Sequence, residues 1–357
     1  MGSKDLVVNE ALFETNPELF ENPYQFEIEQ CEILDSNVAE PIQPKSLDET
    51  PFEYIDQVDR LIKLCDQLGK LNRNRVKEIA VDLEHHSYRS FIGFTCLMQI
   101  STRTNDYIID TIKLRSEMHR LNESFTDPTL LKVFHGADFD IEWLQKDFGI
   151  YVVNMFDTGQ ATRILQYPHH SLSYLLKLFC DVDAQKQFQL ADWRTRPLNE
   201  SMLKYAREDT HYLLYIYDNL RNDLIKLEES RPCFTANSSH LRQVHENSKT
   251  ICKKVYKKPT FYSKGFLNLC NHNSHLNAKQ MKALKDLYAW RDKMARESDE
   301  SHDYVLKNHQ LLKIAELLPR EHHGILALCN PVTTMLETNV HELHEIVKSA
   351  REFKGTI

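Results

Sequence analysis

Residues 79–84 of the chain read Ile79-Ala80-Val81-Asp82-Leu83-Glu84, a short apolar and β-rich stretch that predicts a strand. Because side chains alternate along a strand, Asp82 and Glu84 point to one face while Val81 and Leu83 point to the other. Two carboxylates this close repel each other unless a cation or a proton lies between them, and Mg²⁺ or Mn²⁺ prefers paired oxygen ligands. A lone Asp-x-Glu pair more often belongs to an ordinary strand edge that faces water, so the motif is weak by itself.

A second acidic stretch, residues 135–144, reads HGADFDIEWL and follows a predicted buried strand over residues 130–135. The strand ends near Gly136 and a helix begins at about Asp138. Ligand sites in open α/β folds lie beyond the carboxyl ends of strands, which makes Asp140 a candidate ligand. For Asp138 the simpler interpretation is a favourable interaction with the helix dipole in the first turn.

A third acid lies on a helix predicted to begin near Asn199. Asp209 completes the helical spacing of an apolar stripe and therefore takes a place that faces the core. Buried acids need partners, and Tyr205, four residues earlier, brings a phenol to nearly the same face. The stripe consists of Met202, Ala206, Leu213, Ile216, Leu220 and Leu224.

The length of the chain, 357 residues, predicts two domains, each with its own core. Further strands are expected over 95–101, 107–110 and 151–156, and a helix at 58–68 is expected to precede the first strand. The order of elements indicates an α/β sheet flanked by helices. The expected organisation is an extended arm over 1–50, the α/β domain over 51–228, a linker over 229–272 and a helical domain over 273–353.

Composition narrows the function classes. The formal net charge of −8 argues against a protein that binds nucleic acid mainly through a broad basic surface. Eight scattered cysteines without a CxxC pair suggest neither a zinc module nor a disulfide framework, and a reducing compartment fits them. No apolar run approaches the ~18 residues of a membrane span, so no membrane association is expected.

The three acidic motifs, in this order and with Tyr205 before Asp209, resemble the tyrosine-bearing branch of the DEDD exonuclease superfamily. Residues 50–353 are more specifically similar to the RNase D-like catalytic subunit of the eukaryotic nuclear RNA exosome, including its HRDC domain. Other segments that carry the resemblance are His85-His86-Ser87-Tyr88, Leu97-Met98-Gln99-Ile100-Ser101, Val133-Phe134-His135-Gly136, Phe156-Asp157-Thr158, His170-Ser171-Leu172, Gln189-Leu190-Ala191-Asp192-Trp193-Arg194, Arg196-Pro197-Leu198 and Leu284-Lys285-Asp286-Leu287-Tyr288-Ala289-Trp290-Arg291-Asp292.

The resemblance implies an RNase H-like DEDD exonuclease domain, a mixed sheet flanked by helices, followed by a small all-α HRDC domain. It implies two divalent metal ions, Mg²⁺ with Mn²⁺ or Zn²⁺ able to substitute, and Tyr205 as the residue that orients the attacking water. The expected metal ligands are Asp82, Glu84, Asp140 and Asp209. The residues expected near the substrate are His85, Trp143, Lys186 and Gln189.

The implied activity is 3′→5′ hydrolysis of single-stranded RNA to nucleoside 5′-monophosphates, in the nucleus and nucleolus. Contact with the exosome core would use regions of the family that lie outside this chain, and the chain alone is expected to be a monomer. Two alternatives stay open: a DNA-directed 3′→5′ exonuclease and a non-catalytic RNA-binding scaffold. The HRDC-like helices either contact RNA or present an ordinary solvated face, through Lys279, Lys282, Lys285 and Arg291.

Overall fold

The computed structural model describes residues 21–32, 37–69, 76–230, 239–270 and 276–355. The chain forms two compact units. The first unit joins residues up to 85 with residues 95–257, and the second joins residues 86–94 with residues 258–357. Within the described ranges no helix is both long and apolar enough to cross a membrane.

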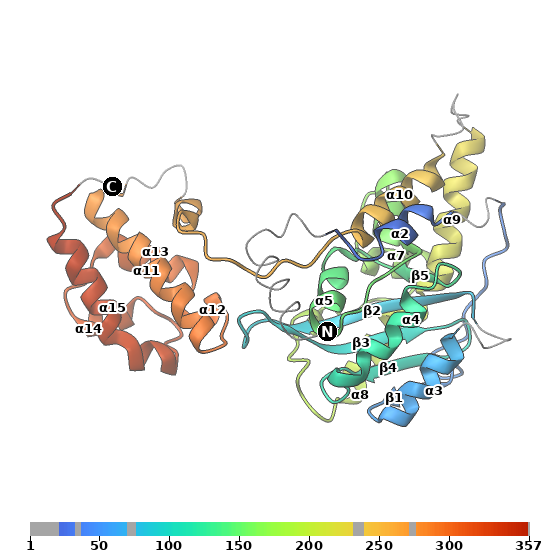
Figure 1. The fold of residues 1–357 in the computed structure, drawn as a ribbon, viewed down its shortest axis with the longest axis horizontal. Coiled ribbons are helices and arrows are strands. Elements are labelled where there is room, and N and C mark those ends of the chain that lie inside the picture. Colours follow the sequence, from blue (N-terminus) through green and yellow to red (C-terminus); the bar gives the residue numbers. More distant parts are fainter. Residues whose placement is uncertain (1–20, 33–36, 70–75, 231–238, 271–275, 356–357) are drawn as a thin grey trace, which may run out of the picture. The chain divides into compact units, whose positions relative to one another are not determined.

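The first unit is built on a six-stranded mixed sheet in the order β1-β4-β3-β2-β5-β6 (Figure 1). Strands β3 and β4 pair antiparallel, whereas the pairs β1 with β4, β2 with β5, and β5 with β6 are parallel. This sheet confirms the predicted mixed α/β fold. The strands are β1 (Phe52–Ile55), β2 (Glu78–His86), β3 (Phe94–Ser101), β4 (Asp106–Asp110), β5 (Leu131–Phe134) and β6 (Met155–Asp157).

Helices surround this sheet, and local signals fix the ends of those that matter for function. Gly149, with a φ of 63°, ends α5 in the left-handed region that suits glycine. Asn199 caps α8 by accepting a hydrogen bond from the backbone nitrogen of Met202 at 2.8 Å. The helical segments are α2 (Gln25–Gln30), α3 (Val58–Leu68), η2 (Arg115–Leu121), α4 (Asn122–Phe125), α5 (Asp138–Phe148), α6 (Thr158–Ile164), α7 (Leu172–Cys180), η3 (Lys186–Leu190), α8 (Glu200–His211), α9 (Leu213–Ser230) and α10 (His240–Cys252).

Several local expectations are wrong at the edges of the fold. Strand β1 precedes helix α3, so the helix does not come before the first strand. The predicted strand over 151–156 begins only at Met155, because the backbone nitrogen of Tyr151 bonds Asn122 Oδ1 and that of Val153 bonds the carbonyl of Phe125. The apolar stripe of α8 and α9 does not lie on one continuous helix, because α8 ends at His211.

The arm and the predicted linker also contain more structure than expected. The arm includes the short helix α2, although its later residues do run extended along the first unit, where Ile42 N bonds Asp218 at 3.0 Å. Residues 240–252 of the predicted linker form α10, whose apolar side chains Leu241 and Val244 are buried. The sequence did not predict this helix, because the face that it buries includes the polar residues His245 and Ser248.

The second unit is a small helical bundle together with residues 86–94. Its core includes Leu287, Trp290, Ile314 and Val347. Its helical segments are η5 (Gly265–Leu269), α11 (Ala278–Glu297), α12 (His302–Val305), α13 (Asn308–Leu317), α14 (His322–Ala327) and α15 (Thr334–Glu352). This bundle confirms the predicted all-α domain.

Residues 86–94 are held in the second unit by polar contacts. The Arg89 guanidinium donates to both carboxylate oxygens of Glu300, with distances of 2.6 Å and 2.9 Å. Asp299 accepts hydrogen bonds from the Ser90 hydroxyl and the Phe91 backbone. The loop between β2 and β3 therefore packs as a part of the helical unit.

Arg291, one of the basic residues suggested for RNA contact, does not face solvent. Its side chain is buried, and it donates to the carbonyl of Leu306 and to Asn308 Oδ1. Lys282 is paired with Asp286 one turn along the helix. Arg291 therefore stabilises the bundle rather than offering a surface charge.

Replacing Leu287 by alanine should destabilise the helical unit by about 2–5 kcal/mol, because a fully buried leucine leaves a cavity that the surroundings fill only partly. Leu317, which is 64% exposed in the same unit, provides the matched control. Leu317→Ala should change the free energy of unfolding by less than about 0.5 kcal/mol. Urea unfolding followed by circular dichroism measures both, and equal midpoints for the two variants would contradict the assigned core.

Candidate active site

Three of the predicted acids converge in the first unit. Asp82 and Glu84 project from β2 and Asp209 from α8, and one carboxylate oxygen from each lies within 4.8 Å of the others. Asp140, from the first turn of α5, is 8% exposed and lies outside this closest group. The strand alternation and the helical stripe thus bring together side chains that are far apart in sequence.

Burial makes this grouping electrostatically unfavourable. It raises the pKa of Asp82 to about 7. Burial, together with the charge of Asp82, also raises the pKa of Glu84, Asp140 and Asp209 well above their usual range. Carboxylates in such a setting either hold protons or share a cation, and their hard oxygen ligands suit a divalent ion. The donor set therefore fits a metal centre.

Tyr205 lies beside the carboxylates. Its side chain is 7% exposed and packs against Trp193 and Phe188, with ring centroids 6.0 Å and 5.6 Å away. Burial and the nearby charge of Asp209 raise the pKa of the Tyr205 phenol, and its hydroxyl donates a hydrogen bond to that carboxylate. The phenol therefore keeps its proton and acts as a donor.

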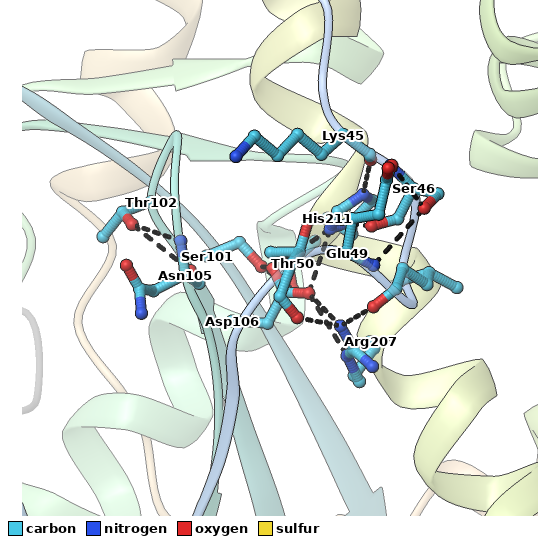
Figure 2. Close-up of polar contacts among 12 residues, drawn as sticks. Lys45, Ser46, Glu49, Thr50, Ser101, Thr102, Asn105, Asp106, Arg207 and His211 are labelled. Carbon is cyan, nitrogen blue, oxygen red and sulfur yellow. Dashed lines mark hydrogen bonds and ion pairs between the residues drawn. The ribbon is translucent and has the colours of Figure 1, made fainter.

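The opposite face of α8 anchors the helix to the sheet and to the arm (Figure 2). Asp106, at the start of β4, accepts from Arg207 Nη2 at 2.8 Å and contacts His211 Nδ1 at 2.9 Å. The same two side chains donate to the carbonyls of Leu47 and Lys45, each at 2.8 Å. Arg207 and His211 flank Asp209 in sequence, so this network fixes the rotation of the helix that presents Asp209.

Asp157 anchors the turn that precedes α5, as Asp106 anchors α8. Its carboxylate accepts from the backbone nitrogens of Gly136 at 3.0 Å and Ala137 at 2.8 Å, and it also caps α6. The turn that leads into Asp140 is thereby held against β6. No role was predicted for Asp157 from the sequence, although an Asp directly before Thr158 is a typical N-cap and was the available signal for this contact.

Of the four residues predicted to lie near the substrate, two contact each other in the structure. His85 and Trp143 stack with ring centroids 4.2 Å apart. Gln189 is exposed on η3, and among the described residues no contact joins it to the carboxylates, while the side chain of Lys186 lies outside the described part. Asp138 forms an ion pair with Lys254 at 2.7 Å.

Gln99 on β3 is a neighbour of the site that sequence analysis did not single out. The residue is fully buried, and in the described part of the chain its amide nitrogen and oxygen make no hydrogen bond of ordinary geometry. The amide nevertheless lies close enough to Glu84 to oppose the rise in the pKa of that carboxyl, which burial dominates. A polar residue between buried Met98 and Ile100 was the available signal.

Two protein-family models match two separate parts of this chain. A family model described as 3′-5′ exonuclease matches residues 52–225, and the HRDC domain model matches residues 280–347. Human exosome complex component 10 is 51% identical over 352 residues, which cover 98% of this chain and 38% of that protein. The exosome complex exonuclease RRP6 of Saccharomyces cerevisiae is 40% identical over 350 residues, or 47% of its length.

Among solved structures, the catalytic core of RRP6 from Trypanosoma brucei superposes with a TM-score of 0.83 at 38% identity. The match covers 92% of this chain and 88% of that one. Escherichia coli RNase D shares the fold, with a TM-score of 0.62 at 20% identity. The chain thus spans less than half the length of these full-length relatives but nearly all of a catalytic core.

The raised pKa of Asp82 predicts a pH-dependent affinity for Mn²⁺. A cation must displace the proton that Asp82 holds below about pH 7, so affinity should rise between about pH 6 and about pH 8. Isothermal titration calorimetry at both pH values measures this change. Asp138→Asn removes an acid that lies outside the group of Asp82, Glu84 and Asp209, and it should leave the change in Mn²⁺ affinity unaltered. Asp82→Asn should weaken Mn²⁺ binding. Equal affinity at the two pH values would contradict the assignment.

Proposed function

This chain belongs to the family of RRP6 and exosome component 10, and from that membership we propose that it is a metal-dependent 3′→5′ exoribonuclease. Its product would be nucleoside 5′-monophosphates released one at a time from a 3′ end. The observation that carries the proposal is the convergence of the half-buried carboxylate of Asp82 with the buried carboxylates of Glu84 and Asp209, beside the phenol of Tyr205. A scaffold that only binds RNA has no need for this unfavourable grouping of charge.

The proposed cofactors are two Mg²⁺ ions, for which Mn²⁺ or Zn²⁺ can substitute. Asp82, Glu84 and Asp209 would hold them, with Asp140 contributing from the edge of the group. Divalent ions at such a site activate the attacking water and stabilise charge on the oxygen that leaves phosphorus. Hydrolysis forms a bond from the water oxygen to phosphorus and breaks the bond to the 3′ oxygen, which leaves as a hydroxyl.

Tyr205 would act by positioning. Because its phenol keeps its proton and donates it to Asp209, the phenol oxygen would accept a hydrogen bond from the attacking water and so fix the direction of approach. The network of Asp106, Arg207 and His211 supports this role indirectly, since it holds the helix from which Tyr205 and Asp209 project. Both functional side chains would lose their alignment if α8 rotated.

We also propose that the protein works with the RNA exosome in the nucleus, including the nucleolus. The support is the identity of 51% with human exosome complex component 10 over nearly the whole of this chain. Contact with the exosome core would use parts of the relatives that this chain does not cover. On its own the chain would act as a monomer on single-stranded RNA 3′ ends.

The test is hydrolysis of matched single-stranded RNA and DNA oligonucleotides by the purified chain in Mg²⁺, with products identified by chromatography. We expect nucleoside 5′-monophosphates from RNA, slower attack on DNA, and a loss of about 10²-fold to 10⁴-fold for Asp209→Asn. Glu208→Gln removes the neighbouring acid, which pairs with Lys204, and should retain activity. Faster attack on DNA would favour a DNA-directed exonuclease, and no hydrolysis of either would favour a scaffold.

Tyr205→Phe removes only the hydroxyl and keeps the ring contacts with Trp193 and Phe188. A positioned acid–base group typically contributes ~10²-fold to ~10⁴-fold, and we expect the loss of the Tyr205 hydroxyl to lower the single-turnover rate on saturating RNA by that order. RNA affinity and Mn²⁺ binding should change little. A near-normal rate combined with a lowered melting temperature would instead make Tyr205 a packing residue.

A further inference from the structure

The guanidinium of Arg196 makes five hydrogen bonds to the surrounding chain. Its Nε and Nη2 donate to the two carboxylate oxygens of Asp110, at 2.7 Å and 3.0 Å. Nη2 also donates to the carbonyl of Cys96 at 2.9 Å, and Nη1 donates to the carbonyls of Trp193 at 2.7 Å and Thr195 at 2.9 Å. A guanidinium carries five N–H donors, so all of them are used and the group is fixed in one orientation.

Two of these acceptors belong to the central sheet. Asp110 is the last residue of β4, and Cys96 lies in β3. Asp110 is fully buried and also accepts a hydrogen bond from the hydroxyl of Tyr54 on β1, at 2.8 Å. A bidentate pair between a guanidinium and a carboxylate fixes direction as well as distance. Arg196 therefore fastens the segment that follows η3 to the edge of the sheet.

The fastened segment packs against Tyr205. Trp193 is only 1% exposed, and its ring is stacked with that of Tyr205 at an angle of 29° between the planes. In the described part of the chain, Trp193 Nε1 makes no hydrogen bond. The indole thus has no polar anchor of its own, and its position depends on packing and on the backbone whose carbonyl Arg196 holds.

The proposed work of Tyr205 requires an accurate position. Its hydroxyl donates to Asp209, so a shift of the ring would change both that bond and the place offered to the attacking water. Packed aromatic rings transmit such a shift, because protein interiors leave little empty space. A misplacement of ~1 Å can lower a reaction rate by ~10²-fold, even when its cause lies away from the reacting atoms.

We propose that Arg196 is a positioning residue for the hydrolysis, which holds the Tyr205 phenol in place through the indole of Trp193. This inference rests on the proposed exoribonuclease function and deepens it, since it names the contact that aligns the residue that orients the water. Among the described residues, no hydrogen bond or ion pair joins Arg196 to the carboxylates of the site. Its effect on the reaction therefore passes through the aromatic wall.

The first test replaces the fork of donors but keeps the charge. Arg196→Lys leaves three donors on a single nitrogen, which cannot reproduce the five bonds. The single-turnover rate on saturating RNA in Mg²⁺ should fall by ~10-fold to ~100-fold. RNA affinity, measured by fluorescence anisotropy in Ca²⁺, and Mn²⁺ affinity, measured by calorimetry, should each stay within about 2-fold, as expected for an interaction that matters in the transition state.

Arg194→Lys is the matched control, because Arg194 lies two residues earlier and its guanidinium pairs with Asp192 at 2.7 Å. Its rate should stay within about 2-fold of the unaltered chain, as is usual for a change outside the reaction's own contacts. A rate for Arg196→Lys equal to that of Arg194→Lys would overturn the proposal.

A double-mutant cycle separates positioning from general stability. If Arg196 acts through the Tyr205 hydroxyl, Arg196→Lys should lower the rate by less than about 3-fold in a chain that already carries Tyr205→Phe. An equal loss with and without Tyr205→Phe would overturn the proposal. Should Arg196→Lys fail to fold, Asp110→Asn takes its place in the cycle, since it keeps the shape of the carboxylate and removes only its charge.

A measurement without activity completes the test. The chain has three tryptophans, so labelling with 5-fluorotryptophan gives three ¹⁹F signals, and Trp193→Phe identifies that of Trp193. Arg196→Lys should shift this signal and leave those of Trp143 and Trp290 in place, whereas an unchanged Trp193 signal would overturn the proposal. Failure of the unaltered chain to hydrolyse RNA would instead overturn the proposed function, and the ¹⁹F spectrum would still show whether Arg196 positions the indole.

Discussion

The mutual repulsion of buried and half-buried carboxylates is the constraint on which the rest of this structure depends. Asp82, Glu84 and Asp209 lie within 4.8 Å of one another, and burial holds the pKa of each above its usual value. Such a group is unfavourable without protons or cations, because each charge loses hydration and meets like charges. The surrounding fold must therefore keep it together from outside.

The scaffold does this with two polar anchors that lie behind the functional side chains. Asp106 holds the far face of α8 through Arg207 and His211, and Asp157 holds the turn before α5. Each anchor is itself a buried acid, but one whose charge is satisfied by hydrogen-bond donors. Asp106 and Asp157, whose charges are met by hydrogen-bond donors, thus hold the elements that carry the site. The carboxylates of the site itself are left for a cation.

The carboxylates of the site could be predicted from the sequence because the periods of a strand and of a helix show which way side chains point. Alternation placed Asp82 with Glu84, and the helical stripe placed Asp209 toward the core. Strand β1 and helix α10 were missed, since β1 is only four residues long and α10 buries polar His245 and Ser248. The anchors at Asp106 and Asp157 depend on contacts between distant segments, which no local pattern encodes.

The three carboxylates are proposed to bind a divalent cation together. Anomalous diffraction from a crystal of the chain grown with Mn²⁺ tests it most directly. We expect a strong Mn²⁺ peak bounded by oxygens of Asp82, Glu84 and Asp209, at metal–oxygen distances of about 2.0–2.6 Å. A peak elsewhere, or no peak at these residues in a crystal grown at about pH 8 with excess Mn²⁺, would contradict it.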